Sequence, residues 1–323
     1  MTTTRRTAIT LLAQAALATV PLLASAQDKP LEWVLGYAAG GGSDIVARTV
    51  AEQMGKTLGR TIVVNNKPGA ATNIAADYAA KSRDFGNIMF TADFATLAAN
   101  PFLFSKLSYS AERDFKPVGL LARFPLLLVV APNVPVTSWQ EFVAWAQKQP
   151  EGVNYASAGA GSPHHLAGEL LRERSGLKLV HVPYRGAAPA VQDIMGGQVS
   201  VGLIDTASVQ QHVASGKVRA IGVASPARLK TLPEVPTLAE QGLKGFEAYA
   251  WQGLVVPSGT GDDVVARLNK ALVAALESTP VKARFQTLGL EPLPGTPEQM
   301  ASYVRAERGR WGALIQANNI RLD

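Results

Sequence analysis

The chain contains no cysteine and only four histidines among its 323 residues. Without cysteine it can form no disulfide bond and offers no thiol for a lipid anchor. The sequence also has no H-E-x-x-H spacing, and two adjacent histidines cannot place both rings on one face of a helix. The histidines are His164, His165, His181 and His212. Neither a metal ion nor any other cofactor is therefore expected.

A strong excess of charge is also missing. The chain has 31 Lys and Arg against 25 Asp and Glu, a net charge of +6. The first 26 residues hold two of the basic residues and none of the acidic ones, so the remainder carries 29 basic against 25 acidic residues, a net charge of +4. No dense basic run with interleaved aromatic residues occurs. Nucleic acid is therefore not an expected partner, whereas a small anionic ligand is compatible with this charge.

The longest apolar run lies at the N-terminus. Arg5-Arg6 precedes the apolar residues 8–20, and Ala24-Ser25-Ala26 offers a small-residue cleavage site. This pattern predicts a secretory signal peptide over residues 1–26, with the mature chain beginning near Gln27. The arginine pair leaves export by the twin-arginine route open. No later stretch approaches the roughly 20 apolar residues of a membrane span, so we expect a protein that is free in the periplasm after cleavage.

Beyond the signal peptide, short apolar runs alternate with helical patterns, which predicts an α/β fold with largely parallel sheets. The predicted strands are residues 31–37, 60–65, 87–91, 116–121, 126–131, 153–157, 178–182, 199–204, 218–224 and 250–256. The predicted helices are residues 43–58, 73–81, 93–97, 138–147, 164–175, 187–195, 207–215, 262–276, 281–288 and 297–317.

One strand-loop-helix device occurs twice. It reads WVLGY-AAGGG-SDIVARTVAEQM and then VNYAS-AGAGS-PHHLAGELLRER. We call residues 37–44 the first glycine loop and residues 157–165 the second glycine loop. The start of a helix has unpaired N–H groups and a partial positive charge, so each loop can seat an anion, and two seats could close on one small anion from both sides.

Simpler roles remain open for the same residues. Glycines at strand-to-helix turns often serve only positive φ angles, Ser43 and Ser162 can be helix N-caps, and Asp44 can complement the helix dipole. A nucleotide site is disfavoured, because no Gly-Lys-Ser/Thr ending follows the first loop and no acidic residue ends the next strand. A serine hydrolase using Ser162 with His164 or His165, oriented by Asp205, also stays open, although no G-x-S-x-G motif is present.

The whole chain resembles the periplasmic solute receptors of tripartite tricarboxylate transporters, the Bug receptors. The matching stretches, in order, are YAAGGGSDIVAR, NNKPGAATNIAA, ANPFLF, YASAGAGSPHHLAGELL, HVPYRGAAPAVQDIMGGQVSVGLID, GKVRAIGVASPARLKTLPEVPTLAEQG and VVARLNKALVAAL.

The resemblance implies a fold and a function. The fold is a two-lobed periplasmic binding protein of type II, a Venus flytrap in which each lobe is a sheet flanked by helices. Chain crossings near residues 123–124 and 246–250 would give one lobe from residues 27–123 plus 250–323 and the other from residues 124–249, with the ligand cleft between them. Such a receptor is a monomer without enzymatic activity. It binds a small carboxylate, such as a di- or tricarboxylate, an acidic amino acid or an aromatic acid, and docks onto membrane permease subunits; a sensor co-receptor of the same fold is the alternative.

The resemblance also implies which residues contact the ligand. They are Tyr37, Ala38, Gly41, Gly42, Ser43, Asp44, Thr91, Asp93, Ser157, Ala158, Gly161, Ser162, His165, Tyr184 and Asp205. Three of them have simpler alternatives: Tyr37 in a lobe core, Tyr184 as a packing aromatic and Asp205 as a helix cap. The segment 81–90 departs from the usual Pro-Asp-Gly turn of the family, and we expect an altered surface hairpin there.

Overall fold

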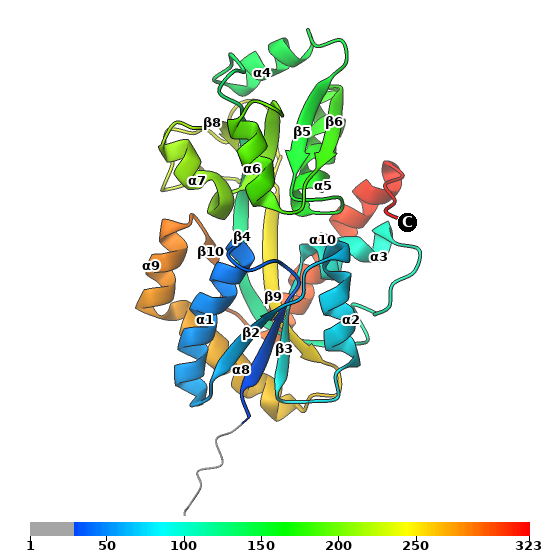
Figure 1. The fold of residues 1–323 in the computed structure, drawn as a ribbon, viewed down its shortest axis with the longest axis vertical. Helices are drawn as coiled ribbons and strands as arrows, with labels where there is room; N and C mark the ends of the chain where they lie inside the picture. The colour runs from blue at the N-terminus through cyan, green and yellow to red at the C-terminus, as the bar shows by residue number, and fades with distance from the viewer. Residues whose placement is uncertain (1–28) are drawn as a thin grey trace, which may run out of the picture.

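The computed structural model describes residues 29–323, so the predicted signal peptide lies outside the described residues. The elements form two groups joined by two long strands (Figure 1). We call the lower group in this view lobe 1 and the upper group lobe 2. Within residues 29–323, no helix is both long and apolar enough to cross a membrane.

Lobe 1 is built on the parallel strands β2, β1 and β3, with β9 antiparallel to β3. Side chains alternate between the two faces of β1, as the period of a strand requires. Leu31, Trp33 and Leu35 pack with α1, α8 and α9, whereas Val34 packs on the opposite side with α2. The bounds are β1 (Leu31–Leu35), α1 (Gly42–Leu58), β2 (Ile62–Asn66), η1 (Ala70–Thr72), α2 (Asn73–Lys81), β3 (Ile88–Asp93), η2 (Ala95–Ala99), α3 (Asn100–Leu103), β9 (Tyr249–Pro257), α8 (Asp262–Glu277), α9 (Thr279–Thr287), β10 (Glu291–Pro292) and α10 (Pro297–Ala317).

Lobe 2 repeats this layered arrangement. Strand β5 lies between β6 and β7 and is parallel to both. Helices α5 and α6 pack against these strands (Figure 1). The bounds are α4 (Trp139–Ala146), β5 (Val153–Ser157), α5 (Pro163–Ser175), β6 (Leu179–Pro183), α6 (Ala187–Met195), β7 (Val201–Asp205), α7 (Thr206–Ala214) and β8 (Arg219–Val223).

One of the two connecting strands, β4 (Phe115–Val130), runs unbroken from lobe 1 into lobe 2. Its first part pairs with β9 as far as Pro125, and from Leu126 onward it pairs with β7. The prediction of two separate strands here was wrong, because it took Pro125, which lacks an N–H donor, as a break. Pairing with β9 keeps the backbone extended through that point.

The prediction of largely parallel sheets was also wrong. Strand β4 is antiparallel to each of its partners β7, β8, β9 and β10. The parallel pairs are confined to the two sets β1–β3 and β5–β7. The antiparallel centre arises because the C-terminal segment returns through β9 alongside β4, which local patterns do not reveal.

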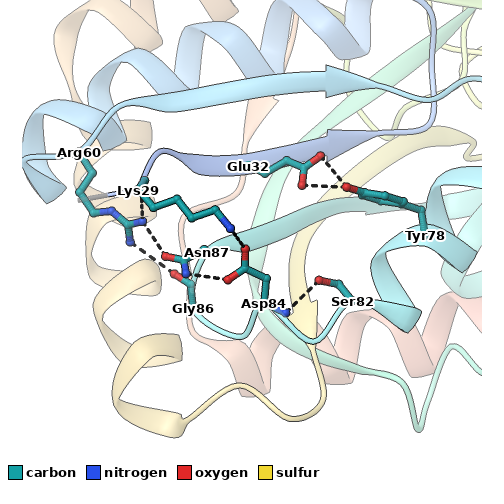
Figure 2. A network of polar contacts seen from close by, with 8 residues as sticks. All are labelled: Lys29, Glu32, Arg60, Tyr78, Ser82, Asp84, Gly86 and Asn87. Carbon is teal, nitrogen blue, oxygen red and sulfur yellow. Dashed lines mark hydrogen bonds and ion pairs between the residues drawn. The ribbon is translucent and has the colours of Figure 1, made fainter. Parts of the chain in front are cut away.

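Residues 82–87 connect helix α2 to strand β3, so the expected surface hairpin was wrong. A polar network holds this turn (Figure 2). Asp84 accepts a hydrogen bond from Asn87 at 2.7 Å and pairs with Lys29, while Arg60 donates to Asn87 Oδ1 at 2.8 Å. Both ends of the ion pair are solvent-exposed, so water screens the attraction and the pair contributes little to stability. The turn lies at the start of β3, whereas the first glycine loop lies beside its end.

Candidate functional site

The first glycine loop leads from β1 into α1 with its backbone largely exposed. Gly41 is the N-cap residue, with extended φ and ψ and no side-chain cap. The first backbone bond of the helix runs from Ile45 N–H to Gly41 O at 3.0 Å. Helix geometry therefore leaves the N–H groups of Gly42, Ser43 and Asp44 without a partner inside the helix. Such a group of donors suits an anion.

Ser43 is not the helix cap. It lies inside the first turn of α1, where its Oγ accepts a hydrogen bond from Gln252 Nε2 on β9. Gly41 takes the cap position because its backbone is extended there. The simpler role considered for Ser43, that of helix N-cap, was therefore wrong.

Asp44 holds the first glycine loop together. Its buried carboxylate accepts from Gly40 N–H, Arg48 Nε and Asn66 Nδ2, each at 2.9 Å. Burial raises the pKa of Asp44, but the hydrogen bonds from Arg48, Gly40 and Asn66 outweigh it, and the pKa lies below its ordinary value. The carboxylate is thus charged and engaged by the loop itself, and its contact with a ligand stays a prediction.

The second glycine loop bends through two glycines with positive φ, Gly159 at 133° and Gly161 at 77°. Ser162 is the N-cap of α5: its Oγ accepts from His165 N–H at 3.2 Å and donates to Gly159 O at 2.6 Å. The amides of Gly161 and Ser162 donate to His165 Nδ1 and to Gly159 O. These two amides therefore stabilise the loop in this structure, and their contact with an anion stays a prediction.

The geometry of the second loop does not form the nucleophile and base of a hydrolase. His165 receives the Gly161 N–H on Nδ1, and its ring stacks on His181 with centroids 3.9 Å apart. Asp205 does contact His164, one of the two histidines that this alternative named, but Ser162 Oγ donates to Gly159 O and bonds neither imidazole ring among the described residues. The serine–histidine contact that does occur joins Ser157 Oγ to His181 Nε2 at 2.6 Å. Burial and the neighbouring His165 lower the pKa of His181 to about 4.

Asp205 links lobe 2 to the first glycine loop. It caps α7 through Ser208 N–H at 3.0 Å, and its Oδ2 lies 3.0 Å from His164 Nε2. A Cβ atom on Gly42 would lie 3.1 Å from Ala207 Cβ and 3.8 Å from Asp205 Oδ1. Burial raises the pKa of Asp205, but the bonds from His164 and Ser208 outweigh it and lower the pKa. The predicted helix cap is confirmed, and this carboxylate lies between His164 of the second glycine loop and Gly42 of the first.

Tyr37, half-buried just after β1, pairs with the buried Asp93 at the end of β3. The Tyr37 hydroxyl donates to Asp93 Oδ2, and Asp93 Oδ1 accepts from Thr96 N–H and Thr96 Oγ1, both at 2.9 Å. Burial raises the pKa of Asp93 above its ordinary value. Burial, together with the charge of Asp93 and the hydrogen bond to it, raises the pKa of Tyr37 well above its ordinary value.

Other predicted site residues bond within their own lobes. Thr91 is buried and accepts from Trp33 Nε1 at 2.7 Å. The Tyr184 hydroxyl donates to Asp193 at 2.6 Å, while its backbone N–H donates to Ser157 O. Ala38 is exposed and Ala158 is half-buried, each within its glycine loop. The structure thus gathers the loop residues, Tyr37, Asp93 and Asp205, and leaves Thr91 in the core of lobe 1.

Sequence reasoning missed two buried amides beside the loops, Gln252 and Asn100. Each is a lone amide residue in an apolar segment, AYAWQGLVVP for Gln252 and LAANPFLF for Asn100. A lone amide in an apolar run indicates a buried polar group, so the sequence could have pointed to both residues. The turn Ala70–Thr72 was also missed. Its three residues have positive φ, 47°, 51° and 72°, an arrangement that costs about 1–3 kcal/mol for each residue and is typical of functional sites.

Comparisons with known proteins agree with the fold. A family model described as "Tripartite tricarboxylate transporter family receptor" matches residues 46–320. A structure of R. palustris Rpa4515 with adipate is 31% identical, with a TM-score of 0.86, and covers 91% of this chain and 98% of that one. The periplasmic binding protein BugD is 34% identical, with a TM-score of 0.85 and coverage of 91% and 99%.

A third solved structure is MatC (Rpa3494) from Rhodopseudomonas palustris with bound malate. It is 33% identical, with a TM-score of 0.82, and covers 88% of this chain and 98% of that one. These proteins are receptors that bind solutes and are not enzymes, so the hydrolase alternative is set aside. With the family match spanning most of its length and the fold shared with solved members over about nine-tenths of the chain, this chain belongs to the tripartite tricarboxylate transporter receptor family, the TctC or Bug family of periplasmic solute-binding proteins.

Proposed function

We propose that the chain captures a small carboxylate-bearing solute between its lobes and delivers it to a tripartite tricarboxylate-type membrane permease. The observation that carries this proposal is the start of α1. Its unpaired N–H groups, at Gly42 to Asp44, lie where lobe 1 meets Asp205 and Ala207 of lobe 2. A carboxylate accepting from these donors would be covered by the second glycine loop when the lobes are closed.

The helix starts alone cannot supply the affinity. Each contributes about 0.3–1 kcal/mol where it is exposed, whereas micromolar binding requires about 8 kcal/mol. The remainder must come from charge-assisted hydrogen bonds in a site from which water is excluded. Closure is then favoured because only the closed form contacts the ligand from both lobes.

The proposal extends to the organisation and location of the protein. The two lobes, residues 27–123 with 250–323 and residues 124–249, would move as separate bodies about the crossings in β4 and β9. The relatives are periplasmic binding proteins. We therefore propose that this chain is exported, cleaved near Gln27 and free in the periplasm. The adipate-bound relative supports a dicarboxylate as the first ligand to test.

A thermal-shift screen of mono-, di- and tricarboxylates tests the binding function. A ligand at 100 times its dissociation constant adds about 2.7 kcal/mol to the free energy of unfolding, a shift of several degrees. The protein is first unfolded and refolded to remove any carried ligand. If no carboxylate raises the melting temperature, capture is refuted.

Delivery to a permease is tested separately, in cells. Deleting the gene should abolish uptake of the carboxylate that the screen identifies, and restoring the gene should recover it. Normal uptake in the deletion strain, with binding intact, would contradict delivery and favour a sensor.

A further inference from the structure

We propose that the captured carboxylate also carries at least one hydroxyl group, which donates a hydrogen bond to the amide oxygen of Asn100 or of Gln252. The inference rests on the proposed function and narrows its ligand class. It starts from two buried amide oxygens, Asn100 Oδ1 and Gln252 Oε1, which bond with no protein group within residues 29–323. One lies beside each glycine loop.

Asn100 lies at the start of α3 and is fully buried. Its Nδ2 donates to Ala71 O and to Asn73 Oδ1, both at 2.7 Å. A backbone carbonyl can only accept a hydrogen bond, so these contacts fix the orientation of the amide. The Asn100 Oδ1 atom then lies 4.0 Å from the position that a Cβ atom on Gly161 would take, beside the second glycine loop.

Gln252 lies on β9, directly opposite Asp93 on β3, and is 4% exposed. Its Nε2 donates to Ser43 Oγ in the first turn of α1. The Oε1 atom of the same amide therefore lies beside the first glycine loop, on the strand that joins the two lobes.

A buried acceptor without a donor destabilises the protein, and such atoms are rare in folded proteins. A carboxylate cannot supply the missing donor, because its oxygens only accept. A hydroxyl group can donate to one of the amide oxygens, and a second hydroxyl can donate to the other. Sites that bond a substrate hydroxyl reject the analogue that lacks it, so each hydroxyl should improve affinity about tenfold or more.

The charges beside the loops favour a hydroxyl over an ammonium group. A buried ammonium needs an anionic partner. The carboxylates near the loops already have partners: Asp44 bonds Arg48, Asp93 bonds Tyr37, and Asp205 bonds His164. Neutral amide oxygens are what remain, and they suit a neutral donor.

Succinate, malate and tartrate test the inference, because they share four carbons and carry none, one and two hydroxyls. Titration calorimetry on the ligand-free protein should show malate binding about tenfold or more tightly than succinate, with tartrate at least as tight as malate. Gln252→Met should reduce the ratio of malate to succinate affinity to about twofold or less, while succinate still binds. Adipate and 2-hydroxyadipate repeat the comparison at six carbons.

Thr260→Val is the matched control. Thr260 Oγ1 is also a buried atom that bonds with no group in the described part of the chain, but it lies beyond the far end of β9. This variant should keep the wild-type ratio. Asn100→Ala provides a second test should Gln252→Met fail to fold.

Three results would overturn the inference: equal affinity of the wild type for each hydroxylated and plain pair, a ratio unchanged in both Gln252→Met and Asn100→Ala, or tighter binding of aspartate than of malate. If carboxylates bind but hydroxylated and plain ones bind equally well, this inference is refuted while the proposed function stands. If no carboxylate binds, the proposed function fails and the inference fails with it.

Discussion

Gly42→Val should weaken carboxylate binding while leaving the unliganded protein stable. Gly42 is the first residue of α1, and its φ is not in the left-handed region, so other residues can adopt its backbone. A Cβ atom there would lie 3.1 Å from Ala207 Cβ of lobe 2, closer than ordinary van der Waals contact, and 3.9 Å from Phe124 Cε1. The two methyl groups of valine extend further toward α7. The substitution therefore opposes the approach of the lobes.

The size of the effect follows from the crowding. Extra methyl groups forced into a packed contact cost about 1–3 kcal/mol. If closure supplies the binding energy, the dissociation constant rises by about 5- to 150-fold. If the lobes part without ligand, as the proposed function requires, the same side chain leaves this contact, and replacing glycine in a helix changes stability by only about 1 kcal/mol, commonly in the favourable direction.

Titration calorimetry with the best carboxylate measures the affinity, and urea unfolding without ligand measures the stability. Gly41→Ala is the control, because it lies in the same loop but its Cβ would meet only Ala38 O, at an ordinary 3.7 Å. It should bind within about twofold of the wild type. Wild-type affinity in Gly42→Val would show that α1 and α7 do not approach in the bound state, and the closure argument would be wrong.

Three further changes probe the site. Ser162→Ala removes the N-cap of α5, so the free energy of unfolding should fall by about 1 kcal/mol in urea; an unchanged midpoint would contradict the cap. Tyr37→Phe leaves Asp93 Oδ2 without its donor, so the free energy of unfolding in urea should fall by about 1–3 kcal/mol. A fall of less than about 0.5 kcal/mol would argue against the hydrogen bond. His181 has a pKa of about 4 when folded and 6.5 in the unfolded chain, so the folded state binds fewer protons between these values. Stability should therefore fall by about 1–3 kcal/mol as pH drops through this window, and His181→Gln should remove much of that slope; parallel pH profiles of the two proteins would refute the assignment.

Much of the local structure was predictable from residue patterns. The 3.6-residue period of residues 43–58 predicted α1 to within one residue, and the last helix, α10 (Pro297–Ala317), has the predicted bounds. The N-cap role of Ser162 also followed from local chemistry. Helices and caps depend mainly on neighbours within four residues, so the sequence reveals them.

The site was predictable only in part. Both glycine loops lie where the repeated device placed them, but the partners of their side chains differ from expectation. Of the two histidines that the sequence left open, His164 bonds Asp205, and Ser157 bonds His181, a pair that no pattern indicated. These contacts join residues 24 or more positions apart, and no local pattern specifies which side chains face each other across two strands.

By itself, the sequence determined the alternation of strands and helices, the two glycine loops and the likeness to the receptor family. Periodicity, caps and turn residues depend on interactions over a few positions, so the local sequence reveals them. Only the tertiary structure decided that β4 runs unbroken between the lobes, that Gly42 faces Ala207, and that Asn100 and Gln252 each bring a buried amide oxygen to a glycine loop. Those features depend on the C-terminal segment returning through β9 and on how the lobes pack together, which involve residues distant in the chain.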